Sequence, residues 1–232
     1  MPSLIELQNV TQIFSKRSVL ENVNLTINYD DFVGIIGASG SGKTTLLRII
    51  LGIYTPPLGK IIANSASLQH TIGFASQDDA FYPRLTVLEN MFYFGELYGI
   101  SKTILNQRIP YLLQLVKLED AGEATARNLS GGMKRRLGIA LALIHDPKVL
   151  ILDEPTAGLD IVLQRHIWKI INDIRSLGKT IIVSTHDLDA LQEHCTSFIF
   201  IHQKSVYSGA SVKQLISRYR GNLSKLFEAY VQ

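Results

Sequence analysis

The sequence predicts an α/β protein built on a mainly parallel sheet, for two reasons. Four short apolar runs rich in β-branched residues have the composition of strands that are buried on both faces. They lie at residues 32–36, 71–76, 149–152 and 180–184. Helical patterns separate most of these runs, and strands that alternate with helices are typical of an α/β fold.

Helices are predicted where apolar residues recur at helical spacing. The segment 161–177 is the clearest, because Ile167, Ile170 and Ile174 belong to one apolar stripe. The other helices are expected at 43–51, 87–98 and 103–116, with one or two short helices in 212–232. Before the first buried run, residues 4–7 and 23–27 alternate apolar and polar, as strands with one wet face do.

Composition excludes several classes of protein. With 232 residues, 46% of them hydrophobic and 19% charged, the chain is neither disordered nor collagen-like. A net charge of +3 is too small to indicate a nucleic-acid partner or an anionic membrane surface. A single cysteine excludes a disulfide framework and suits a reducing compartment. No apolar run approaches the roughly 20 residues that span a bilayer, and no secretory signal is visible. We therefore expect a cytosolic protein.

Each buried run is followed by residues that can perform chemistry. A Gly-rich segment follows the first run, Gln77 follows the second, Asp153 and Glu154 follow the third, and His186 follows the fourth. In a parallel sheet the carboxyl ends of the strands share one edge, and open α/β sheets bind ligands there. The sequence thus predicts one site at that edge.

The Gly-rich segment matches the phosphate-binding pattern GxxxxGK[ST]. Its residues are Gly37, Ala38, Ser39, Gly40, Ser41, Gly42, Lys43, Thr44 and Thr45. The glycines let backbone N–H groups converge on phosphate oxygens at the start of a helix. Lys43 would reach the β- and γ-phosphates, and the Thr44 hydroxyl would bind Mg²⁺. An accidental Gly-rich turn is the alternative, but the strand before and the helix after favour phosphate binding.

The acidic pair fits the other half of such a site. Asp153 would hold Mg²⁺, usually through water, and Glu154 is placed to act as the general base on an attacking water. Acidic residues that merely end a strand are the alternative. His186 could sense the γ-phosphate and fix that water, although a lone histidine is more often structural.

Two further motifs make the prediction specific. The first is Leu-Ser-Gly-Gly-Met at 129–133, before a long helical pattern, and the second is Pro-Thr-Ala-Gly-Leu-Asp at 155–160. With all motifs in this order, the chain resembles the ATP-binding subunit of an ABC transporter over essentially its whole length. The resemblance implies a P-loop NTPase fold with an N-terminal antiparallel β-subdomain and an inserted α-helical subdomain. The single domain 1–232 would comprise a core at 1–77 and 148–232 and a helical subdomain at 78–147.

The resemblance also implies an ATPase that works as a head-to-tail dimer with two Mg-ATP molecules between its subunits. Ser130, Gly131 and Gly132 would contact the γ-phosphate bound to the opposite subunit, and Asp160 would lie in the loop that crosses the interface. Gln77 would bind Mg²⁺ and link the site to the helical subdomain. Phe14 would stack on adenine; packing in the core is its alternative.

The implied partners are integral membrane permease subunits and a second copy or homologous ATPase subunit, on the cytoplasmic face of the membrane. Tyr93 and its aromatic neighbours would suit docking of the permease, or simple core packing. The basic run 134–136 is interpreted as a solvated helix face, so no nucleic acid is expected. Residues 85–99 and 130–137 favour the exporter branch; an importer ATPase or a soluble non-transport ABC ATPase stays open. A P-loop kinase or switch GTPase has no reason to contain Leu-Ser-Gly-Gly.

Overall fold

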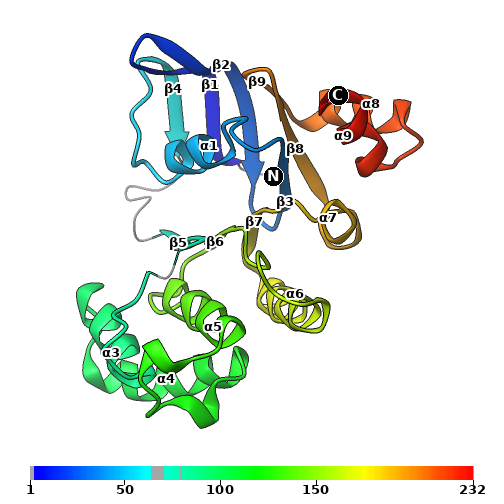
Figure 1. The fold of residues 1–232 in the computed structure, drawn as a ribbon. Coiled ribbons are helices and arrows are strands. Elements are labelled where there is room, and N and C mark those ends of the chain that lie inside the picture. The colour runs from blue at the N-terminus through cyan, green and yellow to red at the C-terminus, as the bar shows by residue number, and fades with distance from the viewer. Residues whose placement is uncertain (1–2, 64–70, 79, 232) are drawn as a thin grey trace. The chain divides into compact units, whose positions relative to one another are not determined.

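The computed structural model describes residues 3–63, 71–78 and 80–231, and its contacts divide the chain into two compact units (Figure 1). The first unit consists of residues 1–69 and 180–232, and the second of residues 70–179. Among the described residues, none of the helices combines the length and apolarity that crossing a membrane requires.

The first unit contains an antiparallel sheet with the strand order β2-β1-β4. Its strands are β1 (Ser3–Phe14), β2 (Arg17–Asn28) and β4 (Leu58–Ala63). Ser15 and Lys16 join β1 to β2 with φ values of 47° and 67°. Two successive positive φ values twist the chain in the sense that a two-residue hairpin needs. The predicted N-terminal antiparallel sheet is confirmed, and β4 is an addition that the sequence analysis did not predict.

The same unit contains the mainly parallel strands. β3 (Phe32–Gly37), which is buried along its whole length, pairs in parallel with β7 (Thr180–Ser184) and with β8 (Ser197–His202). The edge strand β9 (Ser205–Tyr207) is antiparallel to β8. The buried strands at 32–36 and 180–184 are confirmed, whereas β8 and β9 were not predicted.

Four described helices complete the first unit: α1 (Lys43–Ile50), α7 (Leu188–His194), α8 (Gly209–Arg218) and α9 (Leu223–Val231). α1 follows β3 directly and buries an apolar face made of Leu46, Leu47, Ile49 and Ile50. α8 packs against β8, and the two C-terminal helices lie together in Figure 1, coloured orange to red. The predicted helix at 43–51 and the helical tail are therefore confirmed.

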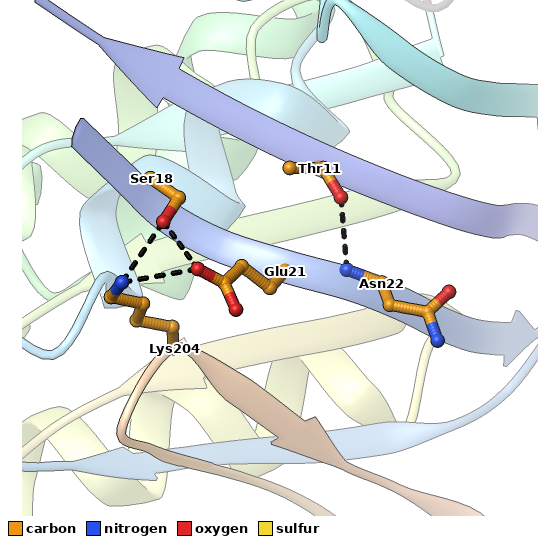
Figure 2. A network of polar contacts seen from close by, with 5 residues as sticks. All are labelled: Thr11, Ser18, Glu21, Asn22 and Lys204. Atoms are coloured by element: carbon orange, nitrogen blue, oxygen red, sulfur yellow. Dashed lines mark hydrogen bonds and ion pairs between the residues drawn. The ribbon is translucent and has the colours of Figure 1, made fainter. Parts of the chain in front are cut away.

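A polar network ties β2 to the turn between β8 and β9 (Figure 2). The Lys204 ammonium lies 3.0 Å from Ser18 Oγ and 3.0 Å from a carboxylate oxygen of Glu21, to which Ser18 Oγ also donates. These contacts lower the pKa of Glu21, the Ser18 hydrogen bond contributing most. The Asn22 N–H donates to Thr11 Oγ1 at 3.0 Å and so joins β2 to β1. The first half of β2 is thereby fixed on two sides.

The second unit is built on the parallel pair β5 (Ile72–Ala75) and β6 (Val149–Asp153), which confirms the other two buried strands. Its helices are α3 (Val87–Leu97), α4 (Lys102–Leu115), α5 (Gly131–Ala142) and α6 (Ile161–Arg175), with 3-10 turns at Glu119–Ala121 and Ala126–Asn128. The predicted helices at 87–98, 103–116 and 161–177 are confirmed to within two residues at each end.

Asn90 organises the start of the helical part of the second unit. Its side chain is fully buried, and its amide nitrogen donates to the carbonyl oxygens of Tyr82, at 3.0 Å, and Thr86, at 2.8 Å. Its amide oxygen accepts from the Tyr82 N–H at 2.8 Å. Thr86 and Glu89 form a capping box at the first turn of α3. The segment that leads into α3 is thus hydrogen-bonded to the helix itself.

Gly73 allows α5 to approach β5 closely. A Cβ atom at residue 73 would lie 2.0 Å from the carbonyl oxygen of Ala142, the last residue of α5, and 2.8 Å from the Pro147 ring. Backbone atoms cannot yield as a flexible side chain does. Gly73 is therefore required by packing.

We expect Gly73→Ala to lower the free energy of unfolding by about 1–3 kcal/mol, because the new methyl group overpacks a backbone contact. The matched control is Gly138→Ala in α5, where an added Cβ meets nothing within 4 Å. Alanine there should raise the free energy of unfolding by about 0.5–1 kcal/mol. Denaturant titration measures both values. Equal shifts for the two variants would contradict the close approach.

Candidate nucleotide-binding site

The phosphate loop connects β3 to α1 and is held by its own lysine. The Lys43 ammonium donates to the carbonyl oxygens of Gly37, at 2.8 Å, and Ala38, at 3.3 Å. The Ser41 N–H donates to the Ala38 carbonyl oxygen at 3.1 Å. The Lys43 side chain is largely buried, at 8% exposure, so the cation is fixed inside the loop.

Three of the loop glycines are required by geometry. A Cβ at Gly37 would lie 2.5 Å from Ser41 Oγ and 2.9 Å from the Ile201 carbonyl oxygen. Gly40 and Gly42 have φ values of 74° and 111°, which side chains disfavour. A side chain at any of these three positions would therefore clash or strain the backbone.

The loop fits an anion that carries several oxygens. α1 begins after Gly42 with no side-chain cap and no acidic residue in its first turn, so its N-terminal N–H groups are available. Ser41 Oγ is buried and has no hydrogen-bond partner among the described residues. Thr44 is exposed at the same helix end. These groups suit a nucleotide phosphate, with Mg²⁺ at the Thr44 hydroxyl.

Phe14 lies at the end of β1 and does not belong to the buried core. Its side chain is 39% exposed and contacts the edge of the Tyr54 ring, with 5.1 Å between the ring centroids. Tyr54 follows the end of α1, and the Arg48 guanidinium donates to its hydroxyl at 2.7 Å. Core packing of Phe14, the alternative raised by the sequence, is wrong. Its ring is available to stack on a base.

Asp153 and Glu154 occupy the end of β6 and the turn after it. They are 7% and 8% exposed, which is unusual for carboxylates. Glu154 has a φ of 50°, in the left-handed region that non-glycine residues seldom adopt. Strained backbone of this kind clusters at functional sites. The geometry favours a role for Glu154 beyond ending the strand.

The motif Leu-Ser-Gly-Gly-Met at 129–133, called the signature from here on, lies at the start of α5. Ser130 is the N-cap, and its Oγ accepts from the Met133 N–H at 3.3 Å. Gly131 is exposed, whereas Gly132 is buried, and a Cβ there would lie 3.3 Å from the Leu163 side chain. Asp160 caps α6, accepting from the N–H groups of Val162 and Leu163 at 2.9 Å each. Both helix starts are thus capped by a side chain, and the Asp160 carboxylate occupies the first N–H groups of α6.

The remaining candidate residues lie where the strand order predicts. His186 is exposed after β7, the parallel neighbour of β3, so in the first unit it shares a sheet edge with the phosphate loop. Gln77 is exposed after β5, the parallel neighbour of β6, so in the second unit it shares an edge with Asp153 and Glu154.

A model of the ABC transporter family matches residues 20–157, more than half of the chain. The chain belongs to the ABC transporter family. It is 35% identical over 208 residues to the Nod factor export ATP-binding protein I of Cupriavidus metallidurans, covering 87% of this chain and 69% of that protein. It is 34% identical over 224 residues to the protein of the same name from Rhizobium sp. strain N33, covering 94% and 74%. Across the relatives of this name, the chain spans 57% to 76% of their length.

Solved structures of ABC ATPases have the same fold. An ATP-binding subunit of an ABC transporter matches with a TM-score of 0.86 and 25% identity, covering 99% of this chain and 100% of that one. The protein cbiO1 from Clostridium perfringens, part of an ABC transporter complex, matches with a TM-score of 0.82 and 26% identity, covering 99% of each chain. The chain is thus an ATP-binding subunit of an ABC transporter with the P-loop NTPase fold, as its motifs indicated.

The structure corrects one interpretation of this ABC subunit. The run 134–136 is half-buried and is not a solvated face. Arg136 Nη1 donates at 2.6 Å to the carbonyl oxygen of Lys117, two residues beyond the end of α4, and burial lowers the pKa of Arg136. Arg135 Nη1 donates to the carbonyl oxygens of Ser76 and Gln77. Sequence reasoning missed both arginines, because only their position just after the signature distinguishes them from surface cations.

We expect Phe14→Ala to weaken nucleotide binding by about 1–3 kcal/mol, because a base loses its stacking partner. Ile13→Ala is the matched control: Ile13 has the same 39% exposure, and its side chain points to the other face of β1. Calorimetric titration with a non-hydrolysable ATP analogue measures both affinities. Equal effects of the two substitutions would rule out stacking by Phe14.

Proposed function

We propose that this ABC subunit binds and hydrolyses Mg-ATP as one half of a dimer and thereby powers export through membrane permease subunits. The observation that carries the proposal is the phosphate loop, in which Lys43 is fixed and the buried Ser41 hydroxyl has no hydrogen-bond partner among the described residues. The relatives named as Nod factor export ATP-binding proteins support the direction of transport.

The chain's own residues would divide the chemistry among them. Lys43 and the N–H groups at the start of α1 bind the β- and γ-phosphates, and the bonds from Lys43 to Gly37 and Ala38 preorganise that cation. Thr44, Asp153 and Gln77 are suited to hold Mg²⁺, which neutralises the charge that develops on the phosphate oxygens.

Hydrolysis needs a base and an oriented water. Glu154 is the proposed general base, which takes the proton of the attacking water, and His186 is proposed to fix that water against the γ-phosphate. Glu154 is only 8% exposed, so bulk water has little access to its carboxylate. Positioning and electrostatics then supply most of the rate enhancement, as for phosphoryl transfer generally.

The second half of each site would come from the other subunit. The start of α5, with Ser130 as its cap and Gly131 exposed, offers N–H groups to the γ-phosphate bound by the partner. Asp160, at the start of α6, is proposed to lie in the interface. ATP thus joins the two subunits, and hydrolysis releases them. We also propose that residues 78–147 act as the helical subdomain of the single ATPase domain.

The proposed docking point for the permease is an aromatic hollow in the helical part of the second unit. It has a volume of about 360 Å³ and is lined by Tyr82, Pro83, Arg84, Leu85 and Tyr93. The rings of Tyr82 and Tyr93 meet edge to face with 4.7 Å between centroids, and Phe94 lies against both. Aromatic side chains around a hollow are typical of interface anchors. Through this partner the chain would lie on the cytoplasmic face of the membrane.

Lys43→Ala should lower ATP hydrolysis by about a hundredfold or more, because the phosphates lose their central cation. Phosphate release under saturating Mg-ATP measures the rate, and a melting curve checks that the variant is folded. Lys60→Ala, an exposed lysine of β4 in the same unit, is the control and should hydrolyse ATP normally. Normal turnover by a folded Lys43→Ala protein would sink the assignment of the site.

Glu154→Gln should retain ATP binding and lose hydrolysis, because the amide keeps the shape of the carboxylate and cannot accept the proton of water. Because the bound ATP is not hydrolysed, the two subunits should stay together as a dimer, which gel filtration with Mg-ATP detects. Glu123→Gln, which removes the same charge from an exposed residue of the same unit, should remain monomeric and active. A Glu154→Gln protein that stays monomeric at saturating ATP would count against the dimer mechanism.

A further inference from the structure

Two separate contacts in the second unit join helix α5 to the segment that contains β5 and Gln77. At one end, the absence of a side chain at Gly73 lets the Ala142 carbonyl oxygen approach β5. At the other end, Arg135 Nη1 donates to the carbonyl oxygens of Ser76, at 3.0 Å, and Gln77, at 2.9 Å. Neither contact depends on the other.

The spacing of these contacts defines how the two elements lie. Residue 142, at the end of α5, meets the strand at residue 73, and residue 135, about 10 Å of helix earlier, meets the chain at residues 76 and 77. α5 therefore runs in the opposite direction to β5. The N-terminal half of α5, which Ser130 caps, lies toward the carboxyl end of β5, where Gln77 follows.

Arginine is well suited to the contact at Gln77. Its Nη1 carries two protons and can serve two carbonyl oxygens at once, and the positive charge strengthens both bonds. The strand ends at Ala75, so the carbonyl groups of Ser76 and Gln77 lie beyond β5. Arg135 thus fixes the backbone on either side of the Gln77 Cα, and with it the direction in which the Gln77 side chain leaves the chain.

We infer that Arg135 is a positioning residue for the ATPase reaction, because it fastens Gln77 to the helix that carries the signature. The inference rests on the proposed function, in which Gln77 helps to bind Mg²⁺ and Ser130 contacts the ATP bound by the partner. Arg135 makes these two contacts move together: when the signature helix shifts, the Gln77 backbone shifts with it. Mg²⁺ coordination in one site is thereby linked to engagement of the other nucleotide.

The test is Arg135→Met, which keeps the length of the side chain and removes its donors. With the purified chain of 232 residues, the affinity for ATP without Mg²⁺ should be unchanged, because the phosphate loop lies in the other unit. The maximal rate of hydrolysis should fall about tenfold to a hundredfold, the effect of losing hydrogen bonds from a charged group. The Mg²⁺ concentration for half-maximal activity should rise. Arg135→Lys, which retains donors and charge, should recover most of both.

The matched control is Arg165→Met, at an exposed arginine of α6 in the same unit, which should keep the normal rate and Mg²⁺ dependence. If Arg135→Met is slow at an unchanged Mg²⁺ requirement, and lysine rescues nothing, Arg135 is merely structural and the inference fails. If Arg135→Met is normal while Lys43→Ala is inactive, the inference fails and the proposed function stands. If the unaltered chain does not hydrolyse ATP, both fail. If Arg135→Met does not fold, Arg135→Gln takes its place in the comparison of maximal rate and Mg²⁺ dependence.

Discussion

The close winding of the phosphate loop is the constraint on which the rest of the site depends. Because a Cβ at Gly37 would come within 2.9 Å of the Ile201 carbonyl oxygen, β3 must deliver the chain into the loop without a side chain at that point. The loop is also confined by β2, since a Cβ at Gly42 would lie 3.0 Å from Leu20. The network of Ser18, Glu21 and Lys204 holds that part of β2 against the β8–β9 turn (Figure 2). The antiparallel sheet thus supports the phosphate loop from one side.

In the second unit, residues at and beyond the ends of β5 and β6 are held in place by other means. Asp153 is held by the last step of β6, and Glu154 by a strained backbone directly after it. Gln77 has no strand to hold it and is fixed by Arg135 instead. The N-terminal end of α5 therefore combines two features: its first turn contains Gly131 and Gly132 of the signature, and its fifth residue, Arg135, holds the segment that contains Gln77.

The sequence predicted the parts of this fold whose cause is local. Buried strands such as β3 and β6 have a continuous apolar composition, and the phosphate loop has a pattern that little else produces. β4 and β9 were missed because neither contains a buried residue, whereas β8 has a continuous apolar run at 198–201 that could have been recognised as a strand. The roles of Arg135 and Gly73 could not be predicted either, since both depend on the approach of α5 to β5. No local pattern encodes a contact between residues 135 and 77.

The hydrogen bonds of Asn90 have a consequence for how the aromatic hollow meets a partner. They hold the backbone of Tyr82 against α3 in the absence of a partner. The Tyr82 side chain is also hydrogen-bonded to that of Tyr93, so the positions of the two rings are fixed relative to each other. A surface that is ordered in advance loses little conformational entropy on association. Docking there would resemble the joining of two rigid bodies, and a displacement of α3 would be transmitted to the partner without being absorbed in a flexible joint. The hollow would then transmit movement of α3 to the partner as well as bind it.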